Sequence, residues 1–220
     1  DPEKLEILLL QMVSLFRAAV LTDMNVPLGH AVGNSLEIAE AVAVLRGENV
    51  SDLRQVCVCL AANMVSLTFD LPIEAAEKRV ITAIDSGAAY EKMKEWISAQ
   101  GGDVRYIEDT SRFEKASIIH EVKSPTDGYI HDMDAEGIGN ASVVLGAGRL
   151  TKGDPIDFSA GIVIRGKAGD KVKKGDVLCE LHTNNADAVA DAEKRYLDAL
   201  VFGSEPPKKK PLIYKVVKGE

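Results

Sequence analysis

Apolar residues recur at helical spacing through most of the first hundred positions. The first such pattern predicts an amphipathic helix over residues 3–16, with apolar positions at Leu5, Leu8, Leu9, Met12 and Leu15. The apolar run at 17–21, followed by Thr22-Asp23, instead predicts a buried strand and its exit turn. Further helices are expected from Asn34 or Ser35 to Gly47, from Asp52 as N-cap through Leu67, from Pro72 to Gly87, and through Trp96 to Gly101. Residues 1–102 are therefore predicted to be mostly helical.

After residue 102 the apolar residues come in short runs separated by Gly and Asp, a pattern typical of strands. The predicted strands are 117–122, 128–131, 142–145, 160–165, 177–182 and a closing strand at 211–217. One Ala-rich helix, at about 186–200, interrupts them. The pattern predicts an α/β (α+β) chain in which a helical segment, 1–102, is followed by a β-rich module, 103–220, with the boundary near 103–115.

Composition narrows the class of partner. The chain carries 26 Lys and Arg against 34 Asp and Glu, a net charge of −8, which argues against nucleic acid as the main partner. No apolar run approaches the roughly 18 residues needed to cross a membrane, so no membrane partner is expected. The chain starts at Asp1 with neither Met nor the layout of a signal peptide, and we expect it to be incomplete.

The three cysteines predict reduced thiols rather than a metal site. Cys57, Cys59 and Cys179 lack paired spacing, and a Cys-x-Cys pair on a helix directs its thiols about 200° apart. Buried thiols in a reducing cytoplasm are the expected state.

The most informative stretch runs from Thr22 to Glu40, TDMNVPLGHAVGNSLEIAE. It predicts a strand exit, a rigid loop at Pro27 and Gly29, and a helix with Glu37 and Glu40 in its first two turns. Such a loop leaves backbone carbonyls without ladder partners, and Glu40 lies far enough along the helix to fold back toward them. Carbonyl oxygens with one carboxylate suit a hard, weakly charged cation better than zinc. Alternatively, both carboxylates simply complement the positive helix N-terminus.

This stretch closely resembles a signature of pyrimidine-nucleoside phosphorylases and thymidine phosphorylases. The likeness continues in order through AIDSGAAYEKMKE at 83–95, AQGGD at 99–103, LGAGR at 145–149 and KAGDKVKKGDVL at 167–178. These matches are spread over nearly all 220 residues and correspond to roughly the C-terminal half of such an enzyme. On this resemblance, residues 1–102 are the mostly helical C-terminal part of the phosphorylase α/β domain, and 103–220 are its β-rich C-terminal module.

The resemblance also implies a potassium ion and no organic cofactor. Bacterial members hold potassium partly through two backbone carbonyls of the Pro-Leu-Gly loop and a glutamate of the following helix. The matching positions here are Leu28, Ala31 and Glu40. The remaining ligands belong to the N-terminal half of the family, so the site in this chain is expected to be partial.

The activity implied by the resemblance is phosphorolysis of uridine, thymidine or deoxyuridine to the free base and a pentose 1-phosphate, by a cytoplasmic homodimer. The family holds phosphate and nucleoside with a Lys-His-Ser-Thr-Gly-Gly loop and with an Arg, a Ser and a Lys, all in its N-terminal half. That loop is absent from this sequence, and its four histidines are scattered singly. We therefore expect no catalytic and no substrate-binding residue here, and an inactive isolated chain. The direct run from Phe16 into Arg17 is also shorter than the connection usual in the family.

The β-rich module suggests other functions. Residues 124–130 and 169–178 resemble, in reverse order, the two half-motifs of biotinyl and lipoyl carrier domains. The segment CELHTNN at 179–185 has no lysine where the attachment site should fall, so a barrel-sandwich fold without carrier function is expected. A scaffold or dimerisation role is a further alternative. Two smaller motifs, GAGR at 146–149 and PPKKK at 206–210, could each contact phosphate or form an ordinary surface turn.

Overall fold

The computed structural model describes residues 18–48, 50–149 and 151–218, and these form two compact units. Within the described residues, the first unit contains 18–23, 44–48, 50–92 and 210–218, and the second contains 24–43, 93–149 and 151–209. Each unit is assembled from separate stretches of chain, whereas the sequence suggested two consecutive segments. The helix predicted over 3–16 and the connection at Phe16-Arg17 lie outside the described residues.

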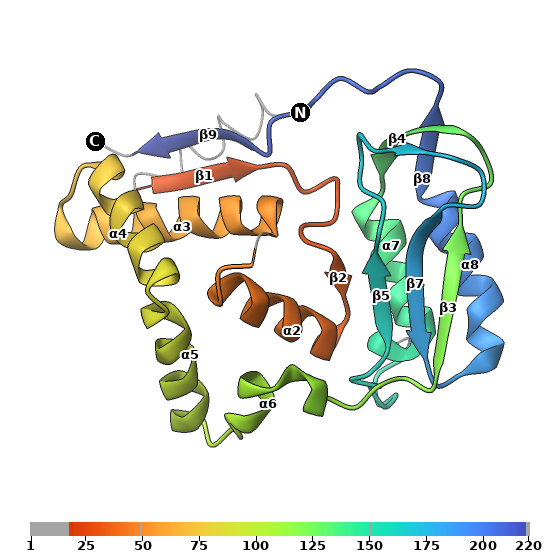
Figure 1. Cartoon of the computed structure of the whole chain (residues 1–220), viewed down its shortest axis with the longest axis horizontal. Coiled ribbons are helices and arrows are strands. Elements are labelled where there is room, and N and C mark those ends of the chain that lie inside the picture. Colours follow the sequence, from red (N-terminus) through yellow and green to blue (C-terminus); the bar gives the residue numbers. More distant parts are fainter. Residues whose placement is uncertain (1–17, 49, 150, 219–220) are drawn as a thin grey trace. The chain divides into compact units, whose positions relative to one another are not determined.

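The first unit packs a strand pair against helices. Strand β1 (Ala18–Thr22) pairs antiparallel with β9 (Ile213–Lys218), the first and last strands of the chain. Helix α3 (Ser51–Phe69) runs along β1 and packs against α4 (Ile73–Asp85), as Figure 1 shows. Helix α5 (Ala88–Ala99) follows. The buried side chains of this unit are small or β-branched for the most part: Leu21, Val44, Val56, Val58, Ala62, Ala76, Ile84 and Val217.

The helix boundaries of this unit follow the sequence signals, with one exception. Pro72 immediately precedes α4, and its carbonyl accepts the amides of Ala75 and Ala76. The prediction that Asp52 caps α3 is wrong. The helix begins at Ser51 after Val50, and the carboxylate of Asp52 bonds the amide of Leu53 within the first turn at 2.8 Å.

The second unit contains two antiparallel sheets. The first has the order β2 (Ala31–Val32), β5 (Gly161–Ile164), β7 (Val177–Thr183), β3 (Ile118–Lys123). The second has the order β6 (Lys171–Val172), β4 (Gly128–Met133), β8 (Leu200–Gly203). Helices α7 (Ala135–Ser142) and α8 (Val189–Asp198) connect the two sheets, whereas α2 (Asn34–Leu45) follows β2 and α6 (Arg105–Glu108) precedes β3. The mixture of helices and antiparallel sheets confirms the predicted α+β class.

One core holds the second unit together. It takes side chains from both sheets and from α7 and α8, including Ile130, Leu181 and Tyr196, all fully buried. The hydroxyl of Tyr196 donates to the carbonyl of Leu178 at 3.3 Å, so its polar end is satisfied inside the core. Burial of each such large side chain contributes about 1.5–3 kcal/mol.

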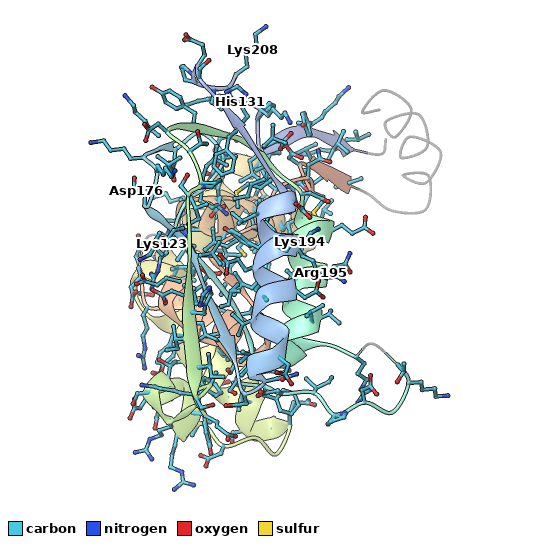
Figure 2. The ribbon with its side chains drawn as sticks, turned by 90° about the vertical axis from the view of Figure 1, so that its right-hand side faces the viewer. Lys123, His131, Asp176, Lys194, Arg195 and Lys208 are labelled. Carbon is cyan, nitrogen blue, oxygen red and sulfur yellow. The ribbon has the colours of Figure 1, made fainter. Side chains whose placement is uncertain are left out.

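Helix α8 shows why the Ala-rich segment is helical. Its inner face buries Ala192 and Tyr196, while Lys194 and Arg195 extend outward (Figure 2). Lys194 pairs with Asp198 at 2.8 Å and Arg195 with Asp191 at 2.9 Å, both at i,i+4 spacing. The helix predicted at 186–200 is thereby confirmed, with a short helical turn at Ala186–Ala188 leading into it.

The strand predicted at 142–145 is wrong. Residues Val143–Ala147 instead continue from α7 as a helical turn. Asp134 caps α7 by accepting the amide of Glu136 at 3.1 Å, and Ile138, Ala141 and Leu145 then fall on one buried face. The cap and this helical spacing outweigh the strand preference of the paired valines.

Within the described residues, no single helix is both long and apolar enough to cross a membrane. Helices α3 and α4, which meet at a bend of 118°, together have the length and apolar composition of a membrane span.

The cysteines should differ sharply in reactivity. Cys179 on β7 is fully buried, which strongly raises the pKa of its thiol, whereas Cys57 is exposed on α3. In the folded chain we expect a thiol reagent such as DTNB to modify Cys57 at least roughly 100-fold faster than Cys179, which should react only after unfolding. Mass mapping of the modified cysteines checks this, with Cys57→Ser as the control that removes the fast phase. Equal labelling of Cys179 in native and denatured chain would contradict the described core.

Candidate functional site

The candidate site is built on the loop that leads into β2. Pro27 and Gly29 are buried in it, whereas Met24 is 79% exposed. Gly29 adopts a φ of 71°, which L side chains rarely adopt. A Cβ at this position would also collide with the Glu40 carboxylate. The loop can therefore close on Glu40 only because residue 29 is glycine.

Glu40 holds the loop from helix α2. Its Oε1 accepts the backbone amide of His30 at 2.7 Å, and its Oε2 accepts the amide of Ala31 at 3.2 Å. Hydrogen bonds from amides to an ionised carboxylate are stronger than those between neutral groups. The side chain thus folds back to the loop, as the sequence predicted, although the groups that it contacts are amides.

Glu37 behaves differently from Glu40. Its Oε1 accepts the amide of Gly33 at 3.0 Å, immediately before the helix begins. This is the arrangement of a carboxylate that satisfies a free amide at a helix N-terminus. The interpretation that both carboxylates only complement the helix therefore fits Glu37 and not Glu40.

A lysine from the β5–β6 connection contacts the same loop. The Nζ of Lys167 donates to the carbonyl of Pro27 at 2.6 Å and to the carbonyl of Gly29 at 2.5 Å. Sequence reasoning missed this contact, because 140 positions separate Lys167 from Pro27 and no local pattern connects them. The loop therefore meets a positive group at its carbonyls and a negative group at its amides.

Strand pairing fixes which way the next residues face. The carbonyl of His30 accepts the amide of Ile164 at 2.7 Å, and Ala31 pairs with Val163. In an antiparallel ladder, successive residues alternate between facing the neighbouring strand and facing away. The carbonyl of His30 thus faces β5, whereas the amides of both His30 and Ala31 face Glu40.

The four histidines are held separately. His30 bonds the carbonyl of Ile164 through Nδ1, His120 bonds Glu193 at 2.7 Å, and His131 bonds the carbonyl of Glu205. The Nε2 of His182 is buried without a hydrogen-bond partner among the described residues, and burial lowers the pKa of this imidazole. Each ring thus has its own structural surroundings, and no two of the rings share a hydrogen-bond partner among the described residues.

The glycine-rich motif at 146–149 is engaged by its carbonyls. The Gly146 carbonyl accepts the amide of Asp157 at 2.9 Å, and the Ala147 carbonyl accepts the side-chain amide of Asn34 at 2.8 Å. Burial alone would raise the pKa of Asp157, but hydrogen bonds from Ser159 and Asn184 lower it below its usual range. These contacts favour the tight-turn interpretation of the motif over a phosphate cradle.

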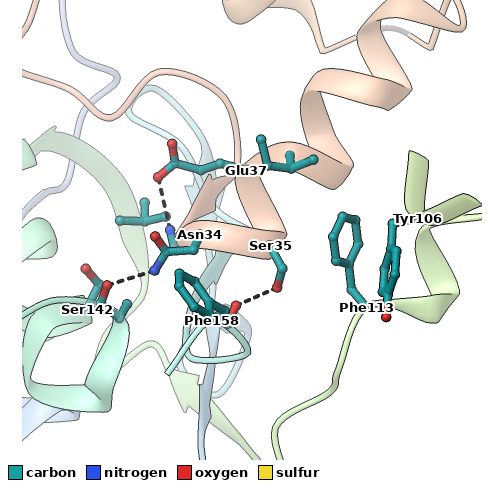
Figure 3. Close-up of a pocket in the computed structure, with 11 residues that line it drawn as sticks. Asn34, Ser35, Glu37, Tyr106, Phe113, Ser142 and Phe158 are labelled. Atoms are coloured by element: carbon teal, nitrogen blue, oxygen red, sulfur yellow. Dashed lines mark hydrogen bonds between the residues drawn. The ribbon is translucent and has the colours of Figure 1, made fainter. Parts of the chain in front are cut away.

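A pocket of about 800 Å³ opens beside the start of α2 (Figure 3). The rings of Tyr106 and Phe113, 5.5 Å apart between centroids, line one side, and the 65%-exposed Phe158 lies across from them. The hydroxyl of Ser35 is already bonded to the carbonyl of Phe158 at 2.6 Å. The lining therefore offers mainly apolar contact, and its titratable side chains among the described residues are Glu37 and Tyr106.

Comparison with known proteins shows which protein family the chain is similar to. Residues 129–202 match the model of the pyrimidine nucleoside phosphorylase C-terminal domain. The chain is 42% identical over 200 residues to the pyrimidine-nucleoside phosphorylase of Staphylococcus aureus strain bovine RF122 / ET3-1, and 41% identical to that of strain USA300. Each alignment covers 90% of this chain and 46% of the relative, so the chain spans about half the length of the curated relatives it matches.

The chain belongs to the pyrimidine-nucleoside phosphorylase family, as its C-terminal part. The match to the C-terminal domain model begins in β4 and ends in β8, so it covers most of the second unit. The Pro27–Ala31 loop lies outside that match.

The loop and Glu40 offer oxygen donors of the kind that the potassium ion expected from the sequence would need. Glu40 and Ala31 are in contact, and Leu28 lies between the two residues whose carbonyls bind Lys167. A carboxylate has about four lone-pair positions, so Glu40 retains acceptor capacity beyond its two amides. In the described part of the chain, no group of three or more His, Cys, Asp or Glu side chains could hold a metal. The donors at the loop are oxygens, which suit a hard cation.

Replacement of Gly29 should test the loop geometry directly. Gly29→Ala introduces a left-handed alanine, which costs roughly 1–2 kcal/mol, and a collision with Glu40 that adds to this. We expect a loss in the free energy of urea-induced unfolding that exceeds the loss in Gly175→Ala, where φ is 95° and the space is open. The excess should shrink in Gly29→Ala/Glu40→Ala, because the colliding carboxylate is gone. Equal losses at positions 29 and 175 would refute the close packing of Glu40 on the loop.

Proposed function

We propose that these 220 residues form the C-terminal half of an enzyme that phosphorolyses pyrimidine nucleosides. The observation that carries the proposal is the 42% identity to a pyrimidine-nucleoside phosphorylase over 90% of the chain. In this reaction the bond between C1′ of the pentose and the pyrimidine nitrogen breaks, and an oxygen of phosphate bonds to C1′. The products are the free base and a pentose 1-phosphate. Uridine, thymidine and deoxyuridine are the proposed nucleosides.

In this proposal the chain supplies support for the reaction and not its chemical groups. The sequence contains no Lys-His-Ser-Thr-Gly-Gly loop, and His30, His120 and His131 each bond a different partner. Groups that bind phosphate and stabilise the departing base would come from the part of the relatives that this chain does not cover. The complete enzyme is proposed to be a cytoplasmic homodimer.

The loop is proposed to take part in holding potassium. The carbonyls of Leu28 and Ala31 and the carboxylate of Glu40 would be the ligands from this chain. The bound ion would supply positive charge that orders the loop. The chain prepares the position itself, because Glu40 is held by two amides and Gly29 permits the close approach of the backbone. Pre-positioned ligands reduce the entropy that is lost when an ion binds.

A barrel-sandwich module without carrier function is the second proposal, for the β-rich part. Its support is that the turns of the two half-motifs pair: the amide of Ser124 donates to Asp176 at 2.8 Å, and the amide of Gly175 donates to Ser124 at 2.9 Å. Figure 2 places Asp176 close to the end of β3 at Lys123. The segment expected to carry an attachment lysine begins inside β7, between β5 and β3. Intact mass of the purified chain should therefore show neither biotin nor lipoate, and either adduct would refute this proposal.

The proposed phosphorolysis can be tested by joining this chain to the N-terminal half of a relative, which the alignment does not cover. We expect the 220 residues alone to release no uracil from uridine in phosphate buffer. A chimera that carries the N-terminal half of the S. aureus enzyme before this chain should release uracil, with that enzyme as the positive control. Circular dichroism and gel filtration establish whether the chimera is folded. A folded chimera that acts on none of the three nucleosides would count against the proposal, as would turnover by the 220 residues alone.

Potassium binding is tested by a matched pair of variants on α2. We expect KCl to raise the Tm of the chain relative to equal concentrations of choline chloride, because ligand that binds only the folded state stabilises it by about 1.4 kcal/mol at tenfold its Kd. Glu40→Gln should remove this rise, since the amide lacks the carboxylate charge. Glu37→Gln should keep it, because Glu37 bonds Gly33 at the helix start. A potassium effect that survives Glu40→Gln unchanged would favour a merely structural Glu40.

A further inference from the structure

Lys167 holds the Pro27–Gly29 segment from a part of the chain far away in sequence. Its Nζ donates to the carbonyls on either side of Leu28, those of Pro27 and Gly29. The two acceptors are 140 and 138 positions away, so the contact connects the β-rich module to the loop across most of the chain. Charge-assisted hydrogen bonds of an ammonium to two carbonyls fix both peptide groups at once.

The backbone that carries Lys167 is itself fixed. Its amide donates to the carboxylate of Asp170 at 2.8 Å, which closes a turn. The amide of Gly169 donates to Ile130 at 2.7 Å, and the amide of Gly166 donates to Leu178 at 3.0 Å. Ile130 and Leu178 are both fully buried in the core of the second unit. The lysine stem therefore starts from a rigid base, and its ammonium can fix the loop instead of following it.

The amides of the loop, unlike its carbonyls, are bound by Glu40. The carbonyls of residues 27 and 29 face an ammonium, and the amides of residues 30 and 31 face a carboxylate. Each charged group therefore meets the backbone pole that attracts it. The two carbonyls bound by Lys167 are not those of Leu28 and Ala31, which are the carbonyl ligands that the family resemblance implies for potassium.

We propose that Lys167 is a positioning residue for the cation loop. Its ammonium fixes the Pro27–Leu28 and Gly29–His30 peptide groups, and thereby keeps the Leu28 and Ala31 carbonyls and the Glu40 carboxylate in the arrangement that receives the ion. The part of this proposal that concerns potassium rests on the proposed function. The part that concerns loop order rests on the hydrogen bonds of Lys167 alone.

Hydrogen exchange measured by NMR or mass spectrometry tests the loop order in the 220-residue chain. In Lys167→Met we expect the His30 and Ala31 amides to exchange at least about tenfold faster, while those of the core strand β7 keep their wild-type rates. Lys167→Arg should restore much of the protection, because a guanidinium can also donate to two carbonyls. Lys173→Met is the matched control, since its side chain is exposed six positions away. Wild-type protection of both loop amides in Lys167→Met would overturn the proposal, and so would equal loosening in Lys173→Met.

The effect of KCl on loop exchange distinguishes failure of this proposal from failure of the proposed potassium site. In the wild-type chain KCl should slow exchange at His30 and Ala31 relative to choline chloride, and in Lys167→Met the half-effective KCl concentration should rise at least about threefold. If Lys167→Met loosens the loop but KCl changes nothing in either chain, the positioning role stands and the potassium site fails. If KCl protects both chains at the same concentration, the positioning role fails and the potassium site stands. If Lys167→Met lowers the Tm by more than loosening of the loop explains, Lys167→Arg is compared with Lys173→Met in its place. The same exchange measurements then decide whether residue 167 positions the loop.

Discussion

The arrangement of the candidate site depends on one interaction, the acceptance of the His30 and Ala31 amides by the carboxylate of Glu40. An unpaired backbone amide in a partly buried loop carries a free-energy cost, so the carboxylate stabilises a conformation that the loop sequence could not keep alone. Helix α2 also carries Glu37, about one turn before Glu40, and Glu37 accepts the Gly33 amide where the helix begins. The two carboxylates together hold the start of α2 next to the loop and β2. Gly29 is required by the same contact, since any side chain there would occupy the position of the carboxylate.

The second unit supplies the rigid frame against which this interaction operates. Two antiparallel sheets and two helices share one buried core, and the edge strand β2 joins that frame through β5. A two-residue strand contributes little pairing by itself. It is held because His30 adds two further hydrogen bonds to Ile164, one through its backbone carbonyl and one through its ring. The loop is thus attached to the sheet at one end, to α2 through Glu40, and to the β5–β6 connection through Lys167.

Membership of the phosphorylase family gives these contacts a functional setting. The chain spans about half the length of the relatives it matches. Two charged side chains of opposite sign, Glu40 and Lys167, hold the backbone of the loop and its oxygens in place. A loop held in this way would keep the ligands proposed for potassium in place before the ion binds, so that less entropy is lost on binding.

The sequence by itself determined most of the local structure, because local structure depends on neighbours in the chain. Helices α2, α4 and α8 follow from their apolar spacing, and α2 and α4 also from the glycine and proline signals at their ends. The proximity of Glu40 to the loop was also predictable, since only about ten residues separate them. The failures were equally local. Asp52 competes for an amide inside the first turn, and the valines of 142–145 lie on a face that the capped helix α7 continues.

Only the tertiary structure decided the contacts between distant segments. The pairing of β1 with β9, the pairing of β2 with β5 and the contact of Lys167 with Pro27 and Gly29 each join residues more than a hundred positions apart. No periodicity encodes such contacts, because they depend on how the whole core packs and on which backbone groups are left without partners. The sequence could therefore show that the loop offers carbonyl oxygens, whereas only the fold shows that a lysine already binds two of them.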